Sequence, residues 1–152
     1  MVKHSVKKRL NYSNKQMFDL ISDVGQYPDF LPWCISTNIY NQSSNIFYSD
    51  MEIGFKLIKE SFTSKVTVIE SKKVYSEAIS GPFKKMNNIW EIDYVSDKEC
   101  EINLSIEFEF KSFLLQNIIG KLFENASKKM IIAFEERADI LYNNKRGFSS
   151  PH

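Results

Sequence analysis

The stretch "CEINLSIEFEFKSFLLQ", residues 100–116, decides the fold of this chain. Between Ile102 and Phe110 every second residue is apolar, and the residues between them are polar or acidic. This period of two is typical of a β-strand that buries one face and exposes the other. From about residue 112 to residue 142 the apolar residues instead recur every three or four positions, which predicts one long amphipathic helix. A strand followed by a long one-sided helix indicates an α+β protein.

Upstream of this junction, residues 35–110 keep the period of two, with breaks at "NQSSN", "ESKK", "SGPFKK" and "SDKEC". The pattern predicts about six antiparallel strands. One predicted strand runs through Leu57, on a face shared with Met51, Ile53 and Phe55. A later strand is predicted to place Trp90, Ile92 and Tyr94 on one face.

The beginning of the chain predicts one more strand and two short helical segments. Val6 and Leu10 have the same parity, with charged residues between them, as in a strand with a basic exposed face. Ser13 or Asn14 can cap a short helix that follows. The segment "GQYPDFLPWC" contains two prolines, which exclude a long helix and leave room for one helical turn.

A strongly twisted sheet of this size tends to curl, and one long helix can cover its concave side. We therefore expect a single domain over residues 1–145, with a disordered tail at 146–152. The expected architecture is α+β: a curved antiparallel sheet of about seven strands, two short helices after strand 1, and a long C-terminal helix over a hydrophobic tunnel.

The composition excludes several classes of function. Twenty basic and nineteen acidic side chains give a net charge of +1, which does not favour a dedicated DNA or RNA binder. We see no signal peptide and no apolar stretch of membrane-spanning length, so we expect a cytoplasmic protein. Cys34 and Cys100 are expected to stay reduced. His4 and His152 lie near the chain ends, and no catalytic or metal-binding motif is present, so we expect no enzyme, no metal and no cofactor.

Four stretches resemble a known family. "VGQYPDFLPWC", "KESFTSKVTV", "GPFKKMNNIWEI" and "CEINLSIEFEFKSFLLQ" are similar to the motifs of the coenzyme-Q-binding family, whose bacterial members are often named RatA-type ribosome-association toxins. This family belongs to the START-like, helix-grip superfamily of polyketide cyclases and lipid-transport proteins. The resemblance covers the chain to about residue 145, and Ile92 stands where the family more often has Phe.

The resemblance implies a hydrophobic tunnel that holds ubiquinone or a similar polyprenyl lipid, in a non-enzymatic chaperone or carrier that supports respiration. The Gly81 and Pro82 corner would set a loop at the mouth of the tunnel, with the ligand ring held near it. Each candidate could equally be ordinary core. The candidate ligand-binding residues are Phe30, Leu31, Trp33, Met51, Phe55, Phe62, Phe83, Trp90, Phe108, Phe110, Leu115, Ile119, Phe123 and Met130.

Two other partners and one other activity stay open. Lys7, Arg9, Lys84 and Lys85 are candidates for contact with an anionic membrane surface, which would place the protein peripherally at the inner membrane. The relatives' toxin name implies binding to the large ribosomal subunit, which would block subunit association. A cyclase-like enzyme on the same fold would need ionisable groups inside the tunnel, where the apolar pattern places almost none.

Overall fold

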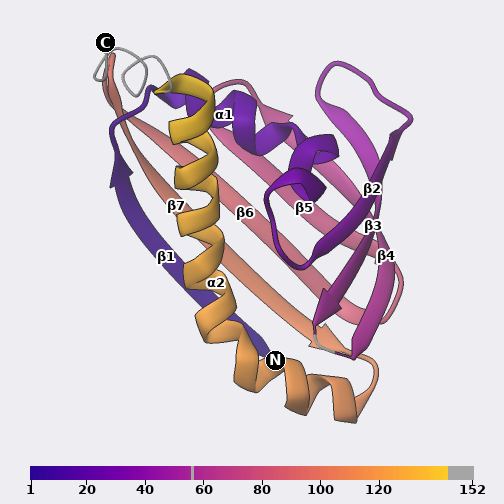
Figure 1. Cartoon of the computed structure of the whole chain (residues 1–152). Helices are drawn as coiled ribbons and strands as arrows, with labels where there is room; N and C mark the ends of the chain where they lie inside the picture. The colour runs from indigo at the N-terminus through magenta and orange to yellow at the C-terminus, as the bar shows by residue number, and fades with distance from the viewer. Residues whose placement is uncertain (56, 144–152) are drawn as a thin grey trace.

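A computed structural model describes residues 1–55 and 57–143 (Figure 1). Seven strands and two α-helices follow one another, with one short 3-10 helix, η1, between α1 and β2. The elements are β1 Val2–Leu10, α1 Asn14–Ser22, η1 Val24–Asp29, β2 Cys34–Tyr40, β3 Ile46–Phe55, β4 Ile58–Ile69, β5 Lys73–Ser80, β6 Phe83–Ser96, β7 Glu99–Phe110 and α2 Phe113–Tyr142. This order confirms the predicted α+β architecture.

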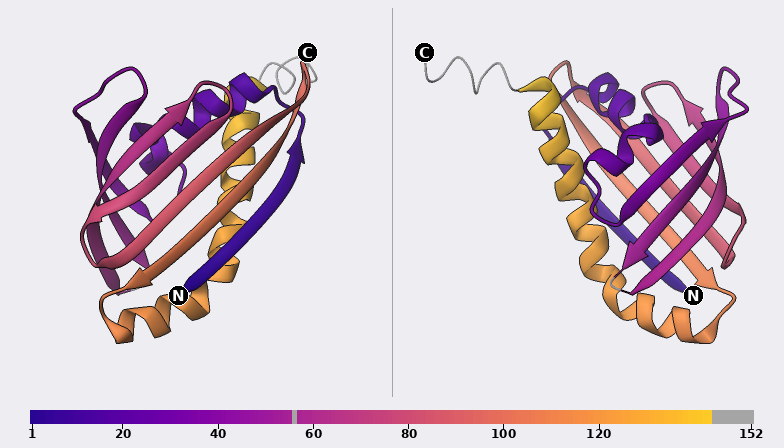
Figure 2. Two further views of the ribbon diagram at one scale, coloured as in Figure 1. Left: turned by 180° about the vertical axis from the view of Figure 1, so that it is seen from behind. Right: turned by 45° about the vertical axis from the view of Figure 1, so that its right-hand side comes forward.

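The strands form one antiparallel sheet in the order β1-β7-β6-β5-β4-β3-β2. The first strand therefore pairs with the last one, and β1 and β2 are the two edges of the sheet. The sheet curves around α2, which lies across its concave side, while the other face carries no helix in the described chain (Figure 2). Helix α1 and η1 cover the same concave side near one end (Figure 1).

The alternation in β7 gives the sheet its two faces. Ile102, Leu104, Ile106, Phe108 and Phe110 are each at most 6% exposed, and the residues between them are half-buried. The odd-numbered glutamates of β7 face the helix-free side, where lysines of the neighbouring strands reach them. The predicted period of two is thus confirmed along the whole strand.

The two short helical segments also form as predicted. Ser13 is the N-cap of α1: the Gln16 N–H donates to its hydroxyl at 3.1 Å, and its own N–H donates to Gln16 Oε1 at 3.0 Å. This reciprocal pair is a capping box, which satisfies two backbone N–H groups at the start of the helix. Pro28 lies within η1, the helical turn expected in the segment that contains the two prolines.

The prediction of one continuous strand through Leu57, across residues 46–62, is wrong. The pairing of Phe55 with Ile58 shows that β3 ends and β4 begins here, and Leu57 is fully exposed between them. The apolar positions change from odd numbers in β3 to even numbers in β4, as expected when a chain reverses. A pattern read as one continuous strand misses this change.

Three other large side chains are more exposed than predicted. Tyr94 is 62% exposed beside a register shift between Tyr94 and Ser96, and its hydroxyl donates to Asp97. Such a shift bends a strand locally. Ile118 and Leu141 were expected on the apolar face of α2 but are 37% and 45% exposed. The predicted disordered tail at 146–152 and the boundary at 145 lie outside the described residues.

In the described chain, no helix combines the length and apolar character that crossing a membrane requires.

Candidate functional site

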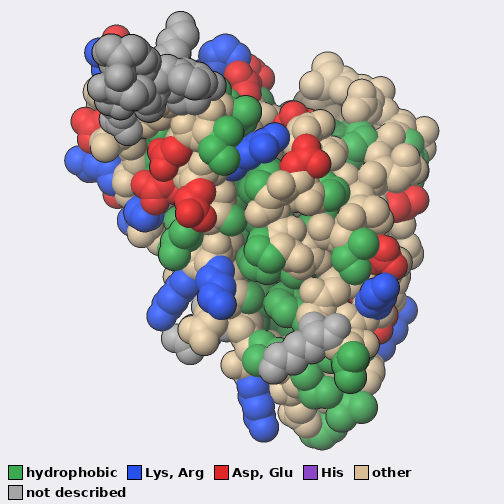
Figure 3. All heavy atoms as spheres, in the orientation of Figure 1, with side chains coloured by type: hydrophobic (Ala, Val, Ile, Leu, Met, Phe, Trp, Pro, Cys, Tyr) green, Lys and Arg blue, Asp and Glu red, His purple; other side chains and the backbone are tan. Residues whose placement is uncertain are grey.

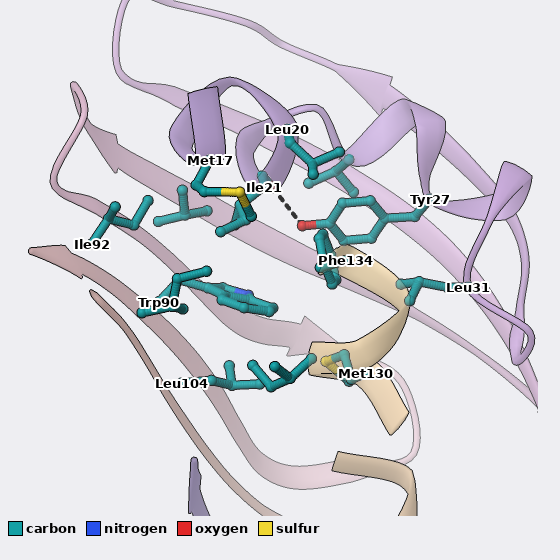
Figure 4. Packing of buried hydrophobic residues seen from close by; sticks show 14 of the residues in the cluster. Met17, Leu20, Ile21, Tyr27, Leu31, Trp90, Ile92, Leu104, Met130 and Phe134 are labelled. Atoms are coloured by element: carbon teal, nitrogen blue, oxygen red, sulfur yellow. Dashed lines mark hydrogen bonds between the residues drawn. The ribbon is translucent and has the colours of Figure 1, made fainter. Parts of the chain in front are cut away.

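The space between the sheet and the helices divides into two parts. The first, which we call the core half, is the tightly packed region beneath α1, η1 and the C-terminal part of α2. Phe134 of α2 lies at its centre, with ring centroids 4.7 Å from Trp90 and 5.2 Å from Tyr27 (Figure 4). The Tyr27 hydroxyl donates to the Ile21 carbonyl and joins η1 to α1.

Polar contacts fix the C-terminal end of α2 to this half. The Tyr142 hydroxyl donates to the Gln16 carbonyl at 2.9 Å, and the Asn143 amide donates to the Tyr12 hydroxyl at 2.7 Å. Tyr12 itself donates to Asp139. The end of α2 is therefore joined directly to α1 and to the segment that precedes it.

The second part, which we call the cavity half, lies beneath the N-terminal half of α2 and contains a partly open cavity of about 120 Å³. We call this space the inner cavity. Its lining is apolar with one exception and comes from the sheet, α2 and the segment between η1 and β2. The lining residues are Trp33, Met51, Ile53, Phe55, Phe62, Phe83, Met86, Asn88, Ile106, Phe108, Phe110, Ile119, Phe123 and Met130.

Phenylalanine rings dominate one end of the inner cavity. Phe83 stacks on Phe110 with centroids 4.6 Å apart and meets Phe62 edge-on at 5.1 Å. Phe123 of α2 lies edge-on to Phe108 of β7 at 4.7 Å. Offset and edge-to-face pairs of this kind hold aromatic walls in fixed positions.

The Gly81 corner builds this aromatic end. Gly81 has φ +124°, and a Cβ there would lie 2.6 Å from Phe62 Cβ and 3.0 Å from the Ser61 carbonyl oxygen. Only glycine fits such a conformation and such a close approach without strain. The Pro82 carbonyl then accepts a hydrogen bond from the Lys111 N–H at 2.8 Å, which fixes the corner to the start of α2.

An open groove of about 310 Å³ adjoins the inner cavity, and we call it the outer groove. Trp33 and Phe55 line both spaces. Their rings stack with centroids 5.8 Å apart and an interplanar angle of 13°. The other lining residues of the outer groove are Pro32, Leu122, Asn125, Ala126 and Lys129. Hydrophobic side chains are visible in the hollow between α2 and the β2–β3 side of the sheet (Figure 3).

The structure brings together most of the candidate residues chosen from the sequence. The ten that line the inner cavity are Trp33, Met51, Phe55, Phe62, Phe83, Phe108, Phe110, Ile119, Phe123 and Met130. Phe30, Leu31, Trp90 and Leu115 do not line it. Trp90 is 3% exposed in the core half, Leu31 is buried, and Phe30 packs on Tyr27 and Phe134. Ligand contact by any of the fourteen stays a prediction.

Ile53, Asn88 and Ile106 also line the inner cavity but were not among the candidates. Met86 lines it too, with the flexible thioether side chain expected of an adaptable lining. Parity could have identified Asn88, because the buried Trp90 and Ile92 fix the inward face of β6 at even-numbered positions. A search for aromatic and apolar residues passes over an asparagine.

Among the described residues, none that lines the inner cavity is ionisable, and the one polar residue of the lining is a carboxamide. Cys34 and Cys100 are buried free thiols outside its lining, and burial raises the pKa of each to about 11. A thiol with such a pKa is protonated at neutral pH and is a poor nucleophile. Among the described residues, no group of His, Cys, Asp or Glu side chains could hold a metal ion.

The candidate partner-contact lysines lie on the helix-free side of the sheet. Lys7 is 3.9 Å from Glu101, Lys84 is 3.5 Å from Glu109, and Lys85 is 2.7 Å from Glu107. The hydrogen bond from Lys85 is the main cause that holds the pKa of Glu107 below its ordinary value. Arg9 is also exposed, opposite Glu101 in the β1–β7 register. These cations are thus interleaved with carboxylates.

Residues 10–135 match the family described as polyketide cyclase / dehydrase and lipid transport, so the chain belongs to this family. Its fold is the START-like, helix-grip fold that the sequence predicted.

Relatives of two kinds are similar over most of the chain. The ribosome association toxin RatA of Rickettsia prowazekii is 36% identical over 135 residues, which cover 86% of this chain and 92% of the relative. Coenzyme Q-binding protein COQ10 homolog B, mitochondrial, of Xenopus laevis is 28% identical over 148 residues, which cover 95% of this chain and 61% of that longer protein. Neither name describes an enzyme.

Solved structures agree with the fold. An 18 kDa protein of Caulobacter crescentus is 31% identical, with a TM-score of 0.78 over 94% of this chain and 99% of that one. The Zhui aromatase/cyclase of a Streptomyces species also has a TM-score of 0.78, over 90% of this chain and 94% of that one. At 12% identity, this second likeness concerns the fold alone.

Proposed function

We propose that this protein binds ubiquinone or a similar polyprenyl lipid between the sheet and α2, and acts as a quinone chaperone or carrier that supports respiratory electron transport. The observation that carries the proposal is the apolar inner cavity, which adjoins the outer groove at Trp33 and Phe55. The names of the family and of the coenzyme Q-binding relative support a lipid ligand.

The driving force for binding is burial of the apolar chain. Each buried methylene contributes about 0.8 kcal/mol, so a polyprenyl chain needs no charged contact. The two spaces together have a volume of about 430 Å³, the sum of 120 and 310 Å³. This volume falls in the range of small-molecule sites, roughly 300–1,000 Å³. The inner cavity alone is too small, so a ligand must occupy both.

The chemistry of the lining supports a binding role without catalysis. A carboxamide does not titrate near neutral pH, so the described lining of the inner cavity supplies neither a general acid nor a general base. The two buried thiols are protonated and lie elsewhere. We therefore propose a non-enzymatic protein.

Peripheral contact with an anionic membrane is part of the proposal, with Lys7, Arg9, Lys84 and Lys85 as the contacting residues. Their carboxylate neighbours reduce the local positive potential. We expect weak, strongly salt-dependent binding to vesicles that contain anionic lipid.

The first test is organic extraction of protein purified from a quinone-producing cell, followed by mass spectrometry. Wild-type protein is expected to yield close to one quinone per chain. Met86→Trp fills the inner cavity and should remove the quinone, whereas Ile89→Trp adds the same ring to the same strand on its outward face and should not. Folded wild-type protein that yields no quinone and takes up none when it is added contradicts the proposal.

Ribosome binding is the second candidate function, because the 36% identical relative is named a ribosome association toxin. Sedimentation with large ribosomal subunits at increasing salt tests it. Binding that survives Met86→Trp but disappears in Lys3→Glu/Lys7→Glu would assign it to the β1 surface. Absence of binding at low salt would remove this candidate.

A further inference from the structure

Two successive asparagines on β6 have opposite environments. Asn87 faces the helix-free side, where its amide donates to Glu107 Oε1 at 3.2 Å. Asn88 pairs with Ile106 in the β6–β7 register and lines the inner cavity beside it. The other thirteen residues of the lining are apolar.

The side-chain oxygen of Asn88 has no partner among the described residues. This Oδ1 atom is fully buried and accepts no hydrogen bond. Buried polar atoms in native proteins are nearly always paired, because an unpaired one loses its hydration without compensation. An unpaired amide oxygen on a residue that lines an apolar cavity is therefore a destabilising feature that a ligand with a hydrogen-bond donor can relieve.

We infer that Asn88 binds the oxygen-bearing ring of the ligand inside the inner cavity, so that the ligand enters ring first and its chain lies outward in the outer groove. This inference rests on the proposed function and reverses the sequence-based expectation that the ring stays at the mouth. The unpaired atom is the amide oxygen, which accepts a hydrogen bond and does not donate one, so it can bind a ring hydroxyl and not a ring carbonyl. The ligand class is thus a prenylated quinol, the reduced form of the quinone.

The sizes of the two spaces favour the same orientation. A protein cavity of about 150 Å³ holds a benzene ring, and the inner cavity is of similar size at about 120 Å³. The outer groove is larger, at about 310 Å³, so it can hold more of a flexible chain whose end extends into solvent or lipid. The stacked pair of Trp33 and Phe55, which lines both spaces, would lie where ring and chain join.

The test compares two ligands and three proteins. The ligands are the quinol form of a ubiquinone analogue with a saturated ten-carbon chain, kept reduced under anaerobic conditions, and decylbenzene, which has the same chain on a ring without oxygen. The proteins are the wild type, Asn88→Leu, and the control Ser49→Ala. Ser49 Oγ is likewise buried and unpaired, on a residue 1% exposed, but Ser49 does not line the inner cavity.

Asn88→Leu is expected to weaken binding of the quinol by about tenfold, the effect of losing one buried hydrogen bond. Its affinity for decylbenzene should stay the same or rise, and the ligand-free variant should melt at a higher temperature than the wild type. Ser49→Ala should leave both affinities unchanged. In the wild type the quinol should bind more tightly than its oxidised quinone, whose ring carbonyls cannot donate to Asn88 Oδ1, and Asn88→Leu should remove this difference.

Each alternative outcome overturns the inference in a recognisable way. Equal quinol affinity in wild type and Asn88→Leu, with no preference of the wild type for quinol over quinone, shows that the ring lies elsewhere while lipid binding stands. A wild type that binds neither ligand removes the proposed function and the inference together. If Asn88→Leu does not fold, Asn88→Ala replaces it, with the same expected loss for the quinol.

Discussion

Phe134 and Phe123 lie three turns apart on α2, one in the core half and the other in the cavity half. Phe134 is 1% exposed and contacts the rings of Tyr27, Phe30 and Trp90. Phe123 is half-buried and lines the inner cavity, where it meets Phe108. The comparison teaches that one amphipathic helix can complete the core at one end and leave an apolar space at the other.

The largest expected difference concerns these two phenylalanines. Phe134→Ala should lower the free energy of unfolding by about 3–5 kcal/mol, as expected for a fully packed aromatic residue. Phe123→Ala removes the same atoms beside an existing cavity, and we expect a loss of about 1–2 kcal/mol. Urea unfolding of both variants measures the difference. Equal losses would contradict the division into two halves.

A glycine in each half gives the next comparison. Gly81→Ala places a Cβ 2.6 Å from Phe62 Cβ at positive φ, so we expect a loss of about 2–3 kcal/mol. Gly25→Ala, in η1, meets its nearest atom, Ile39 Cγ1, at 3.7 Å and should change stability by less than about 0.5 kcal/mol. Thermal melts of the two variants test this. A tolerated Gly81→Ala would show that the aromatic end of the cavity can shift.

The two buried thiols should make the free energy of unfolding decrease at alkaline pH. Cys34 and Cys100 both belong to the buried core, and burial raises the pKa of each to about 11. Above about pH 9 the unfolded state loses thiol protons that the folded state keeps, so stability falls as pH rises toward 11. The slope is at most about 1.4 kcal/mol per thiol and pH unit. Unfolding of wild type and Cys34→Ala/Cys100→Ala between pH 8 and 10.5 should give a flatter profile for the variant; parallel profiles would contradict the assignment.

The smallest effect compares the two helix starts. Ser13→Ala removes the capping box of α1 and should cost about 1 kcal/mol. Ser112→Ala removes a single exposed cap at the start of α2, where the Leu115 N–H reaches Ser112 Oγ at 3.3 Å, and should cost less than about 0.5 kcal/mol. The denaturant midpoints of the two variants show which substitution lowers the stability more. A reversed order would mean that the start of α2 is the better fixed of the two.

The sequence predicts the fold well where local periodicity reports burial directly. β7 alternates without exception and α2 keeps its helical spacing, so both follow from pattern alone. Leu57 was misplaced because a tight reversal of the chain changes parity without an obvious turn sequence. Tyr94 was misplaced because a register shift depends on the partner strand, which the pattern of one strand does not show.

The candidate site is less predictable from the sequence than the fold is. An inward parity identifies residues such as Phe108 and Met51, but it cannot separate a core wall from a cavity wall. That distinction depends on how far α2 lies from the sheet, and Trp90 shows the result: it has the right parity and chemistry but lies in the core half. Asn88 had the right parity, yet its role depends on an unpaired atom that only coordinates reveal.

The pairing of β1 with β7 has a consequence for the synthesis of the chain. Leu10 pairs with Cys100, so about ninety residues are synthesised after β1 before its partner strand β7 is available. At ribosomal rates of roughly 5–20 residues per second, the delay is on the order of 5–20 s. During that time the apolar side of β1 has no strand beside it and no α2 above it. The domain therefore completes its fold only after α2 has been synthesised, and a chaperone that shields the nascent β1 is expected to raise its yield more than one that acts on the folded domain.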